Sequence, residues 1–169
     1  MKFKLTHSLV AITMIASPLV FADTKIYAGA DCDHHSGSTE YDRAGGGIRN
    51  KSASEQLVVM CPIVKDNMAM RIGGGLLNAV DRHKDKNVRC TIYSAHRTQL
   101  SNSSNQSPVV KTSKSPNYPQ EVPFAAIPNS GPGARHYMKC NIPPKGKNFS
   151  YIVSYQVNEE LELPLVLVQ

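Results

Sequence analysis

The sequence predicts an all-β protein, an antiparallel β-sandwich of jelly-roll or immunoglobulin-like type that is stabilised by disulfides. Short apolar or alternating segments recur along the chain, with Gly- and Pro-containing turns between them. No window longer than about ten residues carries a 3.6-residue period, so helices are not expected. All four cysteines follow residue 22, and an even number in an exported chain favours two disulfides.

The first 22 residues have the three parts of a secretory signal peptide. Lys2 and Lys4 form the positive segment, and residues 9–15 (LVAITMI) form the apolar segment. Residues 20–22 (VFA) form a cleavage site with small residues. Pro18 interrupts the apolar run well short of the roughly 20 residues that a spanning helix needs. We therefore expect cleavage after Ala22, a single secreted or periplasmic domain over residues 23–169, and no membrane span after cleavage.

The charge balance of the expected mature chain is mild. Loss of Lys2 and Lys4 leaves 17 basic residues against 13 acidic ones, a net charge of +4 instead of +6. No basic segment is interleaved with aromatic residues, so nucleic acid is not expected as a partner.

Strands are predicted where β-branched or alternating residues lie between turn signals, at residues 46–50, 56–64, 76–80, 88–93, 122–127, 136–142 and 149–157. Residues 23–45 are polar and show no period. Gly73-Gly74-Gly75 indicates a turn or bulge, and the charged residues 81–87 indicate a turn. Alternation in the last strand predicts that Tyr151, Val153, Tyr155 and Val157 share one face with Phe149.

Two regions are predicted to lie outside the regular sheets. Residues 97–120 are polar and are expected to form a mobile loop around a weak strand at Val109-Val110. Residues 159–169 form an apolar C-terminal extension, and its segment 161–168 either completes the domain's own sheet or docks as a strand into a partner.

Four cysteines allow three connectivities. Cys90 and Cys140 each lie mid-strand on an alternating face, which favours a bridge between them and leaves Cys32 to pair with Cys61. The other two connectivities remain open. A zinc site is disfavoured because no two cysteines have C-x₂₋₄-C spacing.

Five segments together resemble a group of uncharacterised secreted bacterial proteins: residues 46–52 (GGIRNKS), 59–67 (VMCPIVKDN), 88–93 (VRCTIY), 137–143 (YMKCNIP) and 152–157 (IVSYQV). The resemblance covers residues 30–158, and the spacing of the last three cysteines is its most specific feature. It implies export, paired cysteines and a β-sandwich-like fold, and it implies no activity.

Candidate sites are few. Residues 45–52 (GGGIRNKS) nearly match a phosphate-binding loop, but Asn50 replaces the second glycine and a strand follows. Asp33, His34 and His35 form the densest set of possible metal ligands, and Asp81, His83 and Asp85 form a second set near a turn. A solvated charged loop is the simpler interpretation of both. No metal, cofactor or catalytic residue is therefore assigned, and no nucleophile elbow is present.

The favoured function is a non-catalytic binding or cell-envelope interaction module. Its partner would be a protein or a glycan, contacted through the loops 97–120 and 129–135. The alternatives are a small extracellular hydrolase or metal-dependent enzyme that uses the His34/His35 region, and a structural subunit of a surface assembly.

Overall fold

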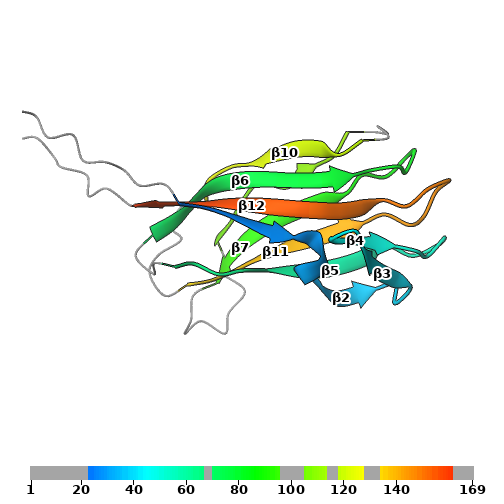
Figure 1. Cartoon of the computed structure of the whole chain (residues 1–169), viewed down its shortest axis with the longest axis horizontal. Coiled ribbons are helices and arrows are strands. Elements are labelled where there is room, and N and C mark those ends of the chain that lie inside the picture. The colour runs from blue at the N-terminus through cyan, green and yellow to red at the C-terminus, as the bar shows by residue number, and fades with distance from the viewer. Residues whose placement is uncertain (1–22, 67–69, 96–104, 114–117, 128–133, 162–169) are drawn as a thin grey trace, which may run out of the picture.

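Two antiparallel sheets packed face to face make up the computed structural model, which describes residues 23–66, 70–95, 105–113, 118–127 and 134–161 (Figure 1). The antiparallel β-sandwich predicted from the sequence is thus the observed fold. No helix in these described ranges is long and apolar enough to cross a membrane.

Sheet A is the front layer in Figure 1. Its strands run in the order β10 (Gln120–Phe124), β6 (Met70–Val80), β12 (Tyr151–Leu161), β4 (Gly47–Asn50) and β3 (Tyr41–Ala44). The first strand, β1 (Asp23–Ala28), pairs with β12 beyond the short segment that β4 occupies.

Sheet B runs in the order β2 (Asp33–Gly37), β5 (Leu57–Ile63), β11 (Arg135–Ile142), β7 (Arg89–Ala95) and β8 (Asn105–Gln106). The short strand β9 (Val110–Lys111) also pairs with β7. Alternate residues of β5 and β11 are buried, which places them between the sheets: Leu57, Val59, Cys61 and Ile63, and His136, Met138, Cys140 and Ile142.

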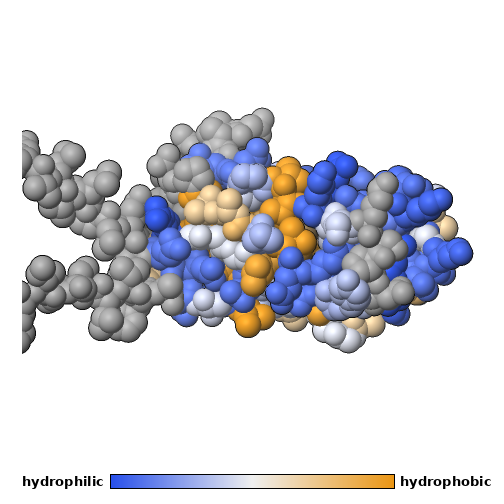
Figure 2. Space-filling view, turned by 90° about the horizontal axis from the view of Figure 1, so that it is seen from above, coloured by the Kyte–Doolittle hydropathy of each residue, from blue (hydrophilic) through white to orange (hydrophobic). Residues whose placement is uncertain are grey.

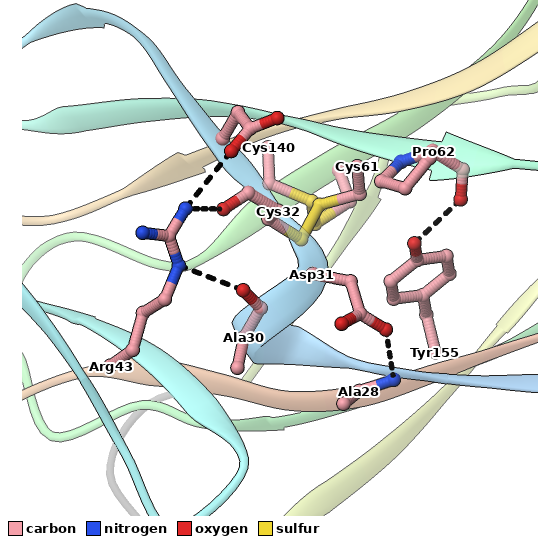
Figure 3. The surroundings of a disulfide bond; sticks show 11 residues. Ala28, Ala30, Asp31, Cys32, Arg43, Cys61, Pro62, Cys140 and Tyr155 are labelled. Carbon is pink, nitrogen blue, oxygen red and sulfur yellow. Dashed lines mark hydrogen bonds and ion pairs between the residues drawn. A yellow bond between two sulfur atoms is a disulfide. The ribbon is translucent and has the colours of Figure 1, made fainter.

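The disulfides join Cys32 to Cys61 and Cys90 to Cys140, as strand alternation predicted. Cys90 and Cys140 lie directly opposite each other on β7 and β11, so this bridge lies within sheet B. Cys32 follows the single 3₁₀ turn η1 (Gly29–Asp31), where the chain crosses from sheet A to sheet B. Arg43 holds this crossing by donating to the carbonyl oxygens of Ala30 and Cys32 (Figure 3).

Residues 23–45, which show no period in the sequence, nevertheless have regular structure. They form β1, η1, β2 and β3, and β1 pairs residue for residue with β12 over Asp23–Ala28. Backbone hydrogen bonds to an existing strand order this polar segment, and a side-chain pattern does not reveal them.

Two irregularities of sheet A bear on the sequence interpretation. The three glycines 73–75 lie inside the continuous strand β6, and a register shift skips Gly73, so the bulge is confirmed and the alternative, a turn, is not formed. A second shift skips Val153. Ile152 and Tyr155 consequently both face the core, so Tyr151 and Val153 do not share the face of Tyr155 as predicted.

Part of the predicted mobile loop is ordered. Within 97–120, residues 105–106 and 110–111 pair with β7, and Ser107 and Thr112 are buried. Residues 97–104 and 114–117, residues 129–133 of the predicted contact loop 129–135, the predicted signal peptide at 1–22 and residues 162–169 of the predicted extension lie outside the described residues.

Candidate functional site

The outer face of sheet B carries a different chemistry from its inner face. While alternate residues of β7 and β11 point into the core, those between them point outward: Arg89, Thr91 and Tyr93, and Tyr137, Lys139 and Asn141. Because an antiparallel sheet sets residues of adjacent strands directly opposite each other, this strand alternation assembles aromatic, amide and cationic groups on one surface.

The strand register arranges these groups in rows across the sheet. One row contains Pro62, Tyr137, Tyr93 and Gln106, and the next contains Met60, Lys139 and Thr91. The third contains Ser36, Val58, Asn141, Arg89 and Lys111. Lys139 and Arg89 are therefore diagonal neighbours on adjacent strands, a relation that separates two residues by about 7–8 Å.

Two adjoining cavities lie over these rows, and together we call them the sheet-B groove. The first, of about 460 Å³, is lined by Ser36, Val58, Thr91, Tyr93, Val109 and Lys139. The second, of about 290 Å³, is lined by Asp85, Lys86, Asn87 and Pro143. Gln56, Arg89 and Asn141 line both cavities, so the groove is continuous. Val58 and Thr91, only 6% and 7% exposed, close its floor.

A pair of stacked tyrosines lies at one end of the groove. The rings of Tyr93 and Tyr137 are 5.1 Å apart between centroids and inclined by 14°. Partial burial and the neighbouring Tyr93 raise the pKa of Tyr137, so its hydroxyl keeps its proton at neutral pH. Neither hydroxyl has a hydrogen-bond partner within the described ranges, which leaves both available to a ligand.

The opposite end of the groove is held by the buried carboxylate of Asp81. Its two oxygens accept four hydrogen bonds, from the backbone N–H of His83 and Val88 and from the hydroxyls of Thr112 (2.6 Å) and Ser150 (3.2 Å). This network fixes residues 81–88, which carry the groove residues Asp85 and Lys86. Asp81 is thus a positioning residue and not part of a solvated loop.

Asn50 supports the same end of the groove. Its side-chain amide nitrogen lies 2.7 Å from the carbonyl oxygen of Glu55 and 3.1 Å from that of Pro143, and its oxygen accepts the N–H of Ser52. The residue that breaks the phosphate-loop pattern is therefore a buried anchor for two loops. Gly45 and Gly46, with φ of 59° and 77°, form the two-residue turn between β3 and β4.

The rim of the groove includes one residue from the predicted mobile loop. Ser107 exchanges hydrogen bonds with the backbone of Ile92, which holds the segment between β8 and β9 against β7. Val109 follows on this segment, 65% exposed and lining the groove. The rest of the groove comes from strands and from loops other than 97–120 and 129–135.

The structure does not bring the candidate metal ligands together. Asp33 forms an ion pair with Arg43, while His34 stacks on Tyr41, with 5.7 Å between the ring centroids. His35 falls at a register shift of β2 and is exposed. The described residues contain no group of three or more potential ligands that could hold a metal ion.

The second set is dispersed as well. Nδ1 of His83 accepts the backbone N–H groups of Asp85 and Lys86, so it serves the turn itself. Asp81 is occupied by its four donors.

Sequence reasoning missed two buried polar residues at the other end of the sandwich. Glu159 is 1% exposed and pairs with Lys25, whose Nζ lies 2.9 Å from Oε1. His136 is 7% exposed, and burial together with nearby Lys65 lowers its pKa to about 4. The alternation in residues 136–142 did place His136 on the inner face, but nothing in the sequence distinguished Glu159 from Glu160.

Sequence reasoning also did not single out the groove residues as a site. Alternation placed Arg89, Thr91 and Tyr93 on one face, but their neighbours on β11 and β5 depend on strand order. A β-sandwich with an open polar and aromatic groove on one sheet is thus the class of protein that the fold and this site define.

Comparisons with known proteins add a fold likeness. No protein-family model matches the chain, and no curated protein matches it in sequence. Among solved structures, a low-affinity xylan-binding module, CBM86, from the xylanolytic gut symbiont Roseburia intestinalis is similar, with a TM-score of 0.46 and 14% identity. The match covers 81% of this chain and 96% of that module. At this level of similarity it assigns no function to the chain.

Proposed function

We propose that the protein is a non-catalytic binding module that holds a glycan chain in the sheet-B groove. The observation that carries the proposal is the continuous groove over the outer face of sheet B, with the solvent-accessible tyrosine stack at one end. A sugar ring presents apolar C–H faces and a rim of hydroxyl groups. The tyrosine rings can stack on the apolar C–H faces. The amides of Gln56 and Asn141 and the hydroxyl of Thr91 can form hydrogen bonds with the sugar hydroxyl groups.

The groove supports binding better than hydrolysis. Glycoside cleavage by the usual route uses a pair of carboxyl groups that flank the scissile bond. The residues that line the groove include one carboxylate, Asp85, at its far end. A polymer held along the face by stacking and hydrogen bonds needs no such pair.

Export to the periplasm or the medium belongs to the same proposal. The two disulfides fit an oxidising compartment, and residues 1–22 have the pattern of a cleaved signal peptide. We expect material purified from the envelope or the medium to begin at Asp23. N-terminal sequencing that begins at Met1 would contradict export by cleavage.

Binding is tested with the full mature chain and a panel of soluble polysaccharides in affinity gel electrophoresis and calorimetry. We expect retention by at least one polysaccharide, and Tyr93→Ala should weaken that binding about tenfold, the loss of roughly 1.4 kcal/mol. Tyr118→Ala is the matched control, because Tyr118 is 69% exposed and does not line the groove. Absence of binding across the panel, or equal loss in both variants, would overturn the proposal.

A further inference from the structure

The sheet-B groove contains more positive than negative charge. Lys86, Arg89 and Lys139 line it, against the single carboxylate of Asp85. Lys111 extends the same side, since it lies opposite Arg89 in the third row. In Figure 2, the visible face of the end that carries the loops 81–88 and 143–150 is mostly hydrophilic.

Among the residues that the structure describes, these cations have no carboxylate partner, unlike the cations of sheet A. In sheet A, Lys25 is ion-paired to Glu159 and Asp66. Arg49 is ion-paired to Asp42, and Arg71 is ion-paired to Glu160. In the described part of the chain, Lys86, Arg89 and Lys139 form no ion pair. A groove with an excess of charge of one sign raises the local concentration of oppositely charged ligands.

The positions of the cations suit a ligand with more than one anionic group. Arg89 and Lys139 are diagonal neighbours on β7 and β11, and Asn141 lies directly opposite Arg89. The guanidinium fork of Arg89 matches a carboxylate in a bidentate arrangement, and Lys139 supplies a point charge beyond it. Val58 and Thr91, which form the buried floor, keep water from one side of such a contact.

We propose that the ligand of the sheet-B groove is an acidic polysaccharide that carries carboxylate groups on its sugar units. Arg89 binds one carboxylate and Lys139 binds another, while Tyr93 contacts a sugar ring between or beside them. This inference rests on the proposed glycan-binding function and adds the chemical class of the glycan.

The test compares polygalacturonate with its fully methyl-esterified form, which has the same sugar backbone without the charges. Alginate and hyaluronan serve as further carboxylated polymers, and neutral xylan and galactan serve as further uncharged polymers. We expect the wild-type chain to bind at least one carboxylated polymer about tenfold more tightly than the uncharged polymers at low salt. The difference should shrink at high ionic strength because salt screens exposed charges.

Two double variants distinguish binding in the groove from a general effect of net charge. Arg89→Gln with Lys139→Gln should weaken binding of the carboxylated polymer roughly a hundredfold, about tenfold for each contact. Lys51→Gln with Lys147→Gln removes the same net charge from exposed residues that do not line the groove, and should change binding less than about threefold.

Each other outcome has a separate meaning. Equal binding of acidic and neutral polymers would overturn this inference and leave the glycan-binding function standing. Equal loss in the two double variants would show that binding follows net charge and not the groove. Inorganic polyphosphate that binds as tightly, with the same dependence on Arg89 and Lys139, would show a general polyanion site and overturn the assignment to a glycan. Binding to no polysaccharide at all would overturn the proposed function as well.

Discussion

Two tyrosine pairs in this molecule have nearly the same local geometry and opposite surroundings. Tyr27 and Tyr155 lie opposite each other on β1 and β12, with 4.9 Å between ring centroids and an angle of 9°. Tyr93 and Tyr137 lie opposite each other on β7 and β11, at 5.1 Å and 14°. The first pair reaches across the sandwich: Tyr155 donates to the carbonyl oxygen of Pro62 and Tyr27 to that of Val64.

The second pair lies on the outside of sheet B, and its hydroxyls have no partner in the described residues. The same cross-strand contact therefore contributes to stability on the inner face, and on the outer face it belongs to the binding surface that we propose. The charges follow the same division, since the cations of sheet A are paired and those of the sheet-B groove form no ion pair with any residue that the structure describes. What an aromatic pair does is set by the face of the sheet that it occupies.

The largest expected effect comes from the inner pair. Tyr155 is 1% exposed, so Tyr155→Ala should lower the free energy of unfolding by about 4 kcal/mol through the cavity it leaves. Tyr155→Phe should cost about 1 kcal/mol, the loss of the hydrogen bond to Pro62. Denaturant unfolding measures both values. A loss below 1 kcal/mol for Tyr155→Ala would contradict the stabilising role of the inner pair.

His136 extends the comparison between the two faces of a sheet, because it is adjacent in sequence to Tyr137 and points the other way, into the core. Its pKa is lowered to about 4 by burial and by Lys65, against about 6.5 in the unfolded chain. Above pH 6.5 His136 is neutral in both the folded and the unfolded state, so it causes no change of stability with pH. Between pH 6.5 and 4 the unfolded state binds a proton that the folded state does not, so stability should fall by about 2–3 kcal/mol.

Urea unfolding at intervals from pH 7.5 to pH 4 measures how steeply the free energy of unfolding falls with pH. His136→Phe keeps a ring at the position and should flatten the curve in this window. Hydrogen bonds to Arg49 and Lys25 lower the pKa values of Asp42 and Asp66. The change in stability that these two carboxyl groups cause therefore lies in the range below pH 4. An unchanged slope in His136→Phe would assign the dependence to another group.

Asp81 tests whether the outer site depends on buried support. Asp81→Asn removes the charge and leaves part of its four-donor network unsatisfied, which should cost about 2 kcal/mol of stability. Since the network fixes residues 81–88, ligand binding at the end of the groove lined by Lys86 should weaken too. Asp85→Asn, at an exposed position in the same loop, should change stability by less than about 0.5 kcal/mol.

A smaller effect on stability than that of the inner pair is expected for the outer tyrosine pair. A double-mutant cycle of Tyr93→Ala and Tyr137→Ala should give a coupling of about 1 kcal/mol, the range of an aromatic pair beyond its burial. Each single variant should remain folded while glycan binding weakens about tenfold. Unfolding measurements and binding titrations on the same preparations distinguish the roles, and a stability loss as large as that of Tyr155→Ala would remove the contrast.

Local patterns in the sequence determined several features by themselves. Alternation in residues 88–93 and 136–142 places Cys90 and Cys140 on one face and Tyr93 on the other, because side chains of a strand point to opposite faces in turn. The even number of cysteines predicted two disulfides, alternation favoured the observed pairing over the other two connectivities, and strand spacing predicted the β-sandwich. These features depend on neighbours a few residues apart.

Tertiary structure alone decided the rest. The bulge at Val153 reverses the alternation of β12 and buries Tyr155 with Ile152, and the strand partner β6 determines where that bulge falls. β1 is a strand because β12 supplies its hydrogen-bond partners, and Glu159 is buried because Lys25 lies on that neighbouring strand. The groove joins residues of β2, β5, β7 and β11, which only the strand order of sheet B brings together, since backbone pairing between distant segments leaves no periodic trace in either one.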